Sequence, residues 1–230
     1  MVGKHYTLKQ IHWDNLCQRY GKEKFAAKFA ASSLVAFVNW TMLPHMSAIW
    51  ESLHAELMPS LQGPRRKMFF DLADPEKRTR EDIRHALDLI VKFQSRFDVI
   101  LGLNEKEAYE IAGVLGLDAS PRDWKGLAEL SVAIQQRVPV DTLVVHPVAY
   151  ALAVSGGVAS VVEGPVCRKP KITTGAGDHF NSGFCLGKLL GLDNAASVLC
   201  GVCTSGHYVR TAESPNVEAL VALMRQYPSE

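Results

Sequence analysis

The sequence has no long run of basic residues and no excess of either charge. Its 25 Lys and Arg residues are balanced by 24 Asp and Glu residues, and the formal net charge is +1. Proteins that bind nucleic acid or anionic membranes through charge usually carry a basic patch or stripe. The charge balance therefore predicts no nucleic-acid partner and favours a small-molecule ligand.

Long apolar segments are missing as well. The most hydrophobic stretch, Leu34–Trp50, is interrupted by Asn39, Pro44 and His45, so it is too short and too polar to span a bilayer. Polar side chains occupy the N-terminal positions where a secretory signal would need an apolar core. We therefore expect a cytoplasmic protein without a membrane partner.

Cysteine is scarce and irregularly spaced. Five cysteines, an odd number, do not suggest a disulfide framework in a chain of 230 residues. Cys200 and Cys203 form a C-x-x-C pair without the second pair that a structural zinc site needs. Because they lie among small and apolar residues at helical spacing, we interpret them as reduced thiols in a buried helix.

Short apolar runs of strand length are each followed by a longer amphipathic segment. Such alternation predicts βαβ units and a mainly parallel sheet covered on both faces. Tyr150–Val154 and Val158–Val162 flank a Ser-Gly-Gly turn and predict an antiparallel hairpin at the far edge. We expect one α/β domain over residues 1–230 with three layers, α/β/α. The parallel strands are predicted at Leu34–Val38, Lys67–Asp71, Asp98–Leu103 and Thr142–Val145.

Helix starts are predicted where a capping residue precedes proline. Asp74–Pro75 and Ser120–Pro121 both fit an N-cap followed by Pro at the first helical position. Before Leu34, the spacing of apolar residues predicts two short helices that are separated by a break at Gly21.

The segment Thr173–Phe184, TTGAGDHFNSGF, joins a glycine-rich turn to an apolar run that ends at Gly191. Gly175–Gly177 are therefore predicted to start a helix, where free backbone N–H groups and the helix dipole can bind a phosphate. Asp178 follows in the first turn, beside that phosphate, where phosphoryl transfer needs a base. Taken alone, the tetrapeptide is equally well interpreted as a tight loop-to-helix turn.

A second polar motif follows a buried strand. Val99–Leu103 ends in Asn104-Glu105-Lys106-Glu107, and apolar residues continue at helical spacing. The carboxyl ends of strands in open α/β sheets face the crevice where ligands bind. An amide and a carboxylate suit a magnesium ion that keeps several of its waters. The alternative is a helix N-cap with acidic residues in its first turn.

Together, the two motifs resemble the signatures of the PfkB carbohydrate kinase family, which has the ribokinase-like fold. The resemblance implies an ATP-dependent kinase that phosphorylates a hydroxyl of a sugar or related small alcohol. It implies Asp178 as the catalytic base and Gly175, Ala176 and Gly177 as the anion hole. The remaining implied contacts are Thr174 for the nucleotide, and Asn104 and Glu107 for Mg²⁺ and the nucleotide phosphates.

The sequence departs from the family pattern in two places. Ile172 stands where the family commonly has Asp, and Val145–Tyr150 lacks the usual glycine-containing turn near the nucleotide. The small-residue helix Ala195–Gly206 is instead the expected wall for adenine. Without an acidic partner that the sequence identifies, three histidines are interpreted as structural or solvent-facing: His146, His179 and His207.

The family's N-terminal features, namely the first strands, a lid and the sugar-gripping residues, are not visible before Leu34. We therefore expect a truncated member whose ribokinase-like fold is incomplete at the N-terminus. The sugar, the activity of the 230-residue chain and the oligomeric state, including a homodimer, stay open. Two alternative functions also stay open: a nucleoside or vitamin-type kinase of the same fold, and a catalytically silent nucleotide-binding protein.

Overall fold

The computed structural model describes residues 5–227, and in this range six strands form one sheet whose spatial order follows the chain. The strands are β1 (Leu34–Phe37), β2 (Arg66–Asp71), β3 (Phe97–Asn104), β4 (Thr142–His146), β5 (Tyr150–Ser155) and β6 (Val158–Glu163). The first four pair in parallel, and β5 and β6 complete the sheet with an antiparallel hairpin. The predicted sheet and its terminal hairpin are confirmed.

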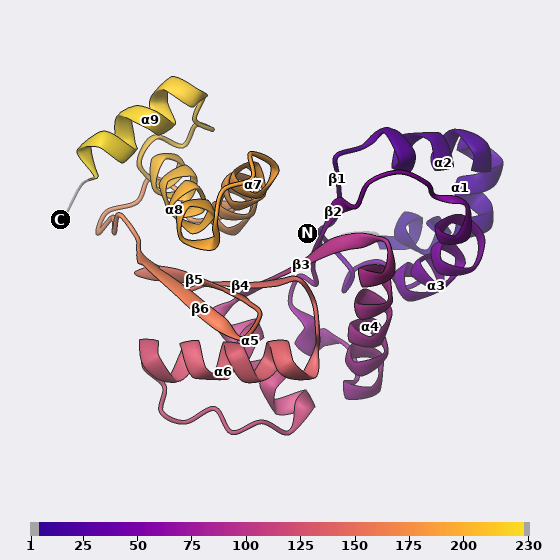
Figure 1. Ribbon diagram of the computed structural model, residues 1–230, viewed down its shortest axis with the longest axis horizontal. Helices are drawn as coiled ribbons and strands as arrows, with labels where there is room; N and C mark the ends of the chain where they lie inside the picture. Colours follow the sequence, from indigo (N-terminus) through magenta and orange to yellow (C-terminus); the bar gives the residue numbers. More distant parts are fainter. Residues whose placement is uncertain (1–4, 228–230) are drawn as a thin grey trace.

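Helices cover both faces of this sheet and give the predicted three layers (Figure 1). Successive strand residues point to opposite faces, so Phe70 packs with the helices before the hairpin and Phe69 with those after it. The helices are α1 (Trp13–Tyr20), α2 (Lys22–Ala31), α3 (Met46–Ser52), α4 (Arg80–Lys92), α5 (Glu105–Leu115), α6 (Trp124–Arg137), α7 (Ala176–Leu189), α8 (Asn194–Thr211) and α9 (Val217–Gln226). Shorter segments are the 3₁₀ turns His5–Gln10, Met58–Ser60, Pro75–Lys77 and Phe93–Ser95, and the π segment Leu53–Leu57.

Two predicted helix starts are wrong. Pro75 opens only a short 3₁₀ turn, and α4 begins at Arg80, where the Thr79 hydroxyl accepts the Asp82 N–H at 3.1 Å. Similarly, α6 begins at Trp124, and the Asp123 carboxylate caps it. In both cases the N-cap has an extended backbone and a side-chain oxygen that accepts an N–H group of the first helical turn, whereas Asp74 is in the left-handed region and makes no such bond.

Helices α7 and α8 pack very closely, because glycine lines their contact. A Cβ on Gly183 would lie 2.3 Å from the Thr204 hydroxyl and 2.6 Å from the Cys200 carbonyl, and one on Gly187 would lie 2.7 Å from the Cα of Ser197. Cys200 and Cys203 are buried free thiols in α8, as predicted. This contact fixes the first turn of α7 over the sheet.

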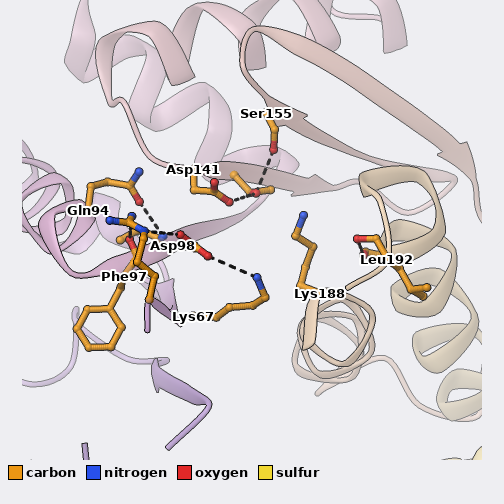
Figure 2. Close-up of polar contacts among 12 residues, drawn as sticks. Lys67, Gln94, Phe97, Asp98, Asp141, Ser155, Lys188 and Leu192 are labelled. Atoms are coloured by element: carbon orange, nitrogen blue, oxygen red, sulfur yellow. Dashed lines mark hydrogen bonds and ion pairs between the residues drawn. The ribbon is translucent and has the colours of Figure 1, made fainter. Parts of the chain in front are cut away.

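Polar contacts lie at the amino edge of the sheet, and Figure 2 shows those of Asp141 and Ser155. The Thr142 hydroxyl donates to Asp141 at 2.8 Å and lies 3.0 Å from the Ser155 hydroxyl. Asn194 then links Ser155 to Lys188, and burial lowers the pKa of that lysine. The network ties the end of α7 to the start of β4. In the described part of the chain, no helix is long and apolar enough to cross a membrane.

Candidate active site

The strand carboxyl ends and the first turn of α7 meet at one edge of the sheet. Asn104 pairs in register with His146, and the His146 ring edge lies 3.2 Å from where a Cβ of Gly177 would sit. The Asn104 and Gly175 segments therefore converge at this edge.

The glycine turn leaves several backbone donors free. Gly175 is the N-cap of α7 with φ 88°, a left-handed conformation that favours glycine, and no side chain caps the helix. The N–H of Ala176 donates to the Thr173 carbonyl at 3.1 Å. Within residues 5–227, the N–H groups of Gly175, Gly177 and Asp178 donate no hydrogen bond. These three groups, rather than that of Ala176, can receive an anion.

Asp178 lies in the first turn of α7, and its side chain is exposed. Its backbone carbonyl accepts the Ser182 hydroxyl at 2.8 Å, and its carboxylate has no hydrogen-bond partner in the described part of the chain. Thr174 lies in the preceding turn and is likewise exposed. The carboxylate is therefore free to accept a proton from a ligand.

Asn104 and Glu107 form a capping box at the start of α5. The Asn104 side chain accepts the Glu107 N–H at 2.9 Å, and the Glu107 carboxylate accepts the Asn104 N–H at 2.9 Å. The second Glu107 oxygen accepts the Asp74 N–H at 2.9 Å, and the residue is only 4% exposed. The N-cap interpretation is confirmed, and both oxygens of this buried carboxylate already bind backbone donors.

Asp71 is a site residue that the sequence analysis missed. It ends β2, and its carboxylate accepts the Ala73 N–H and the Asn181 side-chain amide, both at 2.9 Å. Burial, then the nearby Glu107 and, less strongly, Asp178, raises the pKa of Asp71 to about 7. The signal was present, since Asp71 follows an apolar run just as Asn104 does.

The residues at the carboxyl edge of the sheet suit a divalent cation that keeps its waters better than a cation bound directly by several side chains. In the described range, no group of three or more His, Cys, Asp or Glu side chains could hold a metal ion alone. Burial and the nearby Glu107 nevertheless raise the pKa of Asp71, and within residues 5–227 no cationic side chain lowers it and no donor reaches the buried Asn181 Oδ1. Such unsatisfied negative charge and acceptors fit a magnesium ion that keeps most of its waters.

An apolar cavity of about 260 Å³ lies directly beside the glycine turn. Pro165, Val202 and Gly206 contribute to its wall, so the predicted small-residue helix does line a ligand-sized space. His146 forms part of the end next to Gly177, where burial lowers its pKa to about 4 and keeps the ring neutral. His146 is therefore a neutral, partly buried residue of the cavity wall.

The sheet order, the three layers and the helix start at the strand carboxyl ends define a ribokinase-like α/β protein. The structure is similar to 2-dehydro-3-deoxygluconokinase from Thermotoga maritima, with a TM-score of 0.63 and 16% identity, over 87% of this chain and 62% of that one. It is similar to the ribokinase of the same organism, with a TM-score of 0.62 and 16% identity, over 87% of this chain and 59% of that one.

Sequence comparison narrows this class. Residues 1–227 match the prokaryotic ketohexokinase family, and the chain belongs to this family. It is 26% identical over 221 residues to a ketohexokinase from Haloferax volcanii. The aligned residues make up 96% of this chain and 58% of that protein. The chain thus spans less than two thirds of the length of the relatives it matches.

Proposed function

We propose that this protein takes part in ATP-dependent phosphorylation of a ketohexose hydroxyl. The observation that carries the proposal is the position of Asp178. Its free carboxylate comes directly after Gly175 and Gly177, whose N–H groups donate no hydrogen bond in the described residues. The chain that carries this arrangement belongs to the prokaryotic ketohexokinase family. A base beside an anion cradle is the arrangement that phosphoryl transfer requires.

In this proposal, the apolar cavity holds the adenine and ribose of ATP, and its phosphates extend toward the first turn of α7. The N–H groups of Gly175, Gly177 and Asp178 bind the terminal phosphate, and the helix dipole stabilises its charge. Asp178 takes the proton from the acceptor hydroxyl, whose oxygen forms a bond to the γ-phosphorus while the bond to the β-phosphate oxygen breaks. The products are the sugar phosphate and ADP.

Asp71 and Glu107 would hold a hydrated Mg²⁺ near the phosphates, assisted by Asn104 and the free Oδ1 of Asn181. When bound, the ion supplies positive charge that offsets the charge of the phosphate oxygens. Glu107 would act through water, because its two oxygens already accept backbone N–H groups.

The test is incubation of the purified 230-residue protein with MgATP and a panel of acceptors: fructose, ribose, 2-dehydro-3-deoxygluconate and adenosine. Phosphorylated product is detected by mass spectrometry, and the Asp178→Asn variant runs in parallel. Formation of a ketohexose phosphate by the parent and not by the variant supports the proposal. Turnover of adenosine alone would favour the nucleoside kinase alternative.

A second candidate is a nucleotide-binding protein without catalytic turnover. It is favoured by the coverage of only 58% of the ketohexokinase relative, since part of a complete acceptor site can lie in the remainder of that protein. ATP binding in calorimetry without turnover of any acceptor would establish this candidate. Absence of ATP binding would refute both.

A further inference from the structure

His179 and Tyr208 form a stacked pair behind the glycine turn. Their ring centroids are 3.6 Å apart at an interplanar angle of 11°, and they come from the first turn of α7 and the end of α8. His179 Nδ1 lies 2.7 Å from the Gly175 carbonyl, and the Tyr208 hydroxyl donates to the Thr174 carbonyl at 3.0 Å. The pair therefore contacts two successive carbonyls of the turn that starts α7.

The contacts of His179 define its tautomer. A carbonyl oxygen can only accept, so the hydrogen bond to Gly175 places the proton on Nδ1. In the neutral ring, Nε2 is then an acceptor, and the Ser214 hydroxyl lies 2.9 Å from it and can donate. Two hydrogen bonds and the stack on Tyr208 fix the ring.

The carbonyl contacts also determine where the opposite ends of the peptide groups point. In a trans peptide, C=O and N–H point in opposite directions. The bond from Tyr208 to the Thr174 carbonyl therefore directs the free Gly175 N–H away from the aromatic pair. The bond from His179 to the Gly175 carbonyl directs the Ala176 N–H toward Thr173, where it closes the turn at 3.1 Å.

We propose that His179 and Tyr208 are positioning residues that lock the two peptide groups flanking Gly175 and so preorganise the phosphate-binding turn. Glycine has wide backbone freedom. Rotation of the Thr174–Gly175 peptide would present the Thr174 carbonyl to the phosphate instead of the Gly175 N–H, and rotation of the Gly175–Ala176 peptide would break the turn that the Ala176 N–H closes. This inference rests on the proposed function, because it requires a nucleotide phosphate at the start of α7.

Four variants distinguish a role in positioning the phosphate-binding turn from a role in stabilising the fold. Tyr208→Phe keeps the aromatic stack and removes the donor to Thr174. His179→Gln keeps reach toward Ser214 and loses the Nδ1 donor, whereas His179→Asn retains an amide N–H near the Nδ1 position. His207→Asn is the matched control, because it makes the same change at a histidine of α8 whose side chain makes no hydrogen bond to the turn within residues 5–227.

Each variant is titrated by calorimetry with ATP and with adenosine, which lacks phosphate, and its melting temperature is recorded. We expect Tyr208→Phe and His179→Gln to weaken ATP binding by about 3- to 10-fold, the usual effect of one lost hydrogen bond, with adenosine binding unchanged. His179→Asn and His207→Asn should retain the parent preference for ATP.

An unchanged preference for ATP in Tyr208→Phe and His179→Gln would overturn the inference. Equal loss of ATP and adenosine binding together with a lower melting temperature would also overturn it, because that result indicates a structural role. If the parent protein binds neither ligand, the proposed function fails, and the inference that rests on it fails as well.

Discussion

The side-chain amide of Asn181 donates a hydrogen bond to the carboxylate of Asp71 at 2.9 Å across 110 residues of sequence. The bond joins the carboxyl end of β2 to the second turn of α7, the helix that carries Asp178. It therefore fixes the distance between the acidic edge of the sheet and the glycine turn.

Asp71→Asn should change the pH dependence of stability. The pKa of Asp71 is raised to about 7 in the folded protein from 3.8, so the folded state binds more protons than the unfolded state between these values. Asp71 therefore lowers the stability of the parent as pH rises from about 4 to 7. The free energy of unfolding of the variant minus that of the parent should therefore be larger at about pH 8 than at about pH 5, by on the order of 2 kcal/mol.

The measurement is urea unfolding of parent and variant at both pH values, with and without Mg²⁺. The Asn181 amide can rotate so that its unpartnered Oδ1 accepts a hydrogen bond from the side-chain NH₂ group that the substitution introduces. The change is therefore sterically and chemically acceptable. A stability difference between the two proteins that does not change with pH would show that the pKa of Asp71 is not raised.

Asp178→Asn should abolish phosphoryl transfer and leave ATP affinity within a few fold of the parent. The amide keeps the shape of the side chain but cannot accept the proton of the acceptor, and loss of a general base typically lowers the rate by ~10²–10⁴. Steady-state turnover and ATP calorimetry provide the two readouts. Asp193→Asn, at the N-cap of α8, is the control for removing a carboxylate near a helix start.

If Asp178→Asn retained near-parent turnover, Asp178 would not be the base. Loss of ATP binding together with turnover would instead indicate that Asp178 stabilises the start of α7.

Glu107→Gln should destabilise the protein by about 1–3 kcal/mol, because the amide NH₂ group would face a backbone N–H donor in place of a carboxylate oxygen. The family resemblance implies a Mg²⁺ contact for Glu107, but its carboxylate is buried and both oxygens accept backbone N–H groups. Glu105→Gln, in the same helical turn but exposed, is the control. Thermal unfolding and Mg²⁺ titration in the presence of ATP distinguish the two roles.

A parent-like melting temperature for Glu107→Gln, combined with a weaker Mg²⁺ response, would restore the original interpretation of Glu107 as a residue that serves the metal rather than the fold.

Gly183→Ala should destabilise the α7–α8 contact by about 1–3 kcal/mol, since the added methyl group would overlap the Thr204 side chain and the Cys200 carbonyl. Gly113→Ala makes the same change in α5, where nothing lies within 4 Å, and should stabilise the protein by roughly 0.5–1 kcal/mol through helix propensity. Guanidinium unfolding of both variants checks the pair. Equal effects would mean that α7 and α8 do not pack this closely.

Local patterns were sufficient to predict the sheet, its terminal hairpin and the helix start at Gly175. Strand-length apolar runs and the Gly-Ala-Gly-Asp turn depend on backbone preferences within a few residues, so the sequence contains their full signal. The helix starts at Asp74 and Ser120 were wrong because nearby Thr79 and Asp123 compete for the same cap, and local patterns do not rank such competitors.

Only the tertiary structure decided the chemical surroundings of the site. Asp71 and Asn181 are distant in sequence, so their hydrogen bond and the raised pKa of Asp71 follow from how α7 packs on the sheet. The burial of Glu107 depends on Asp74, which lies on another connection. The stack of His179 on Tyr208 likewise depends on how α8 packs against α7. Burial and long-range hydrogen bonding are properties of the packed chain, whereas a motif records only which residues follow one another.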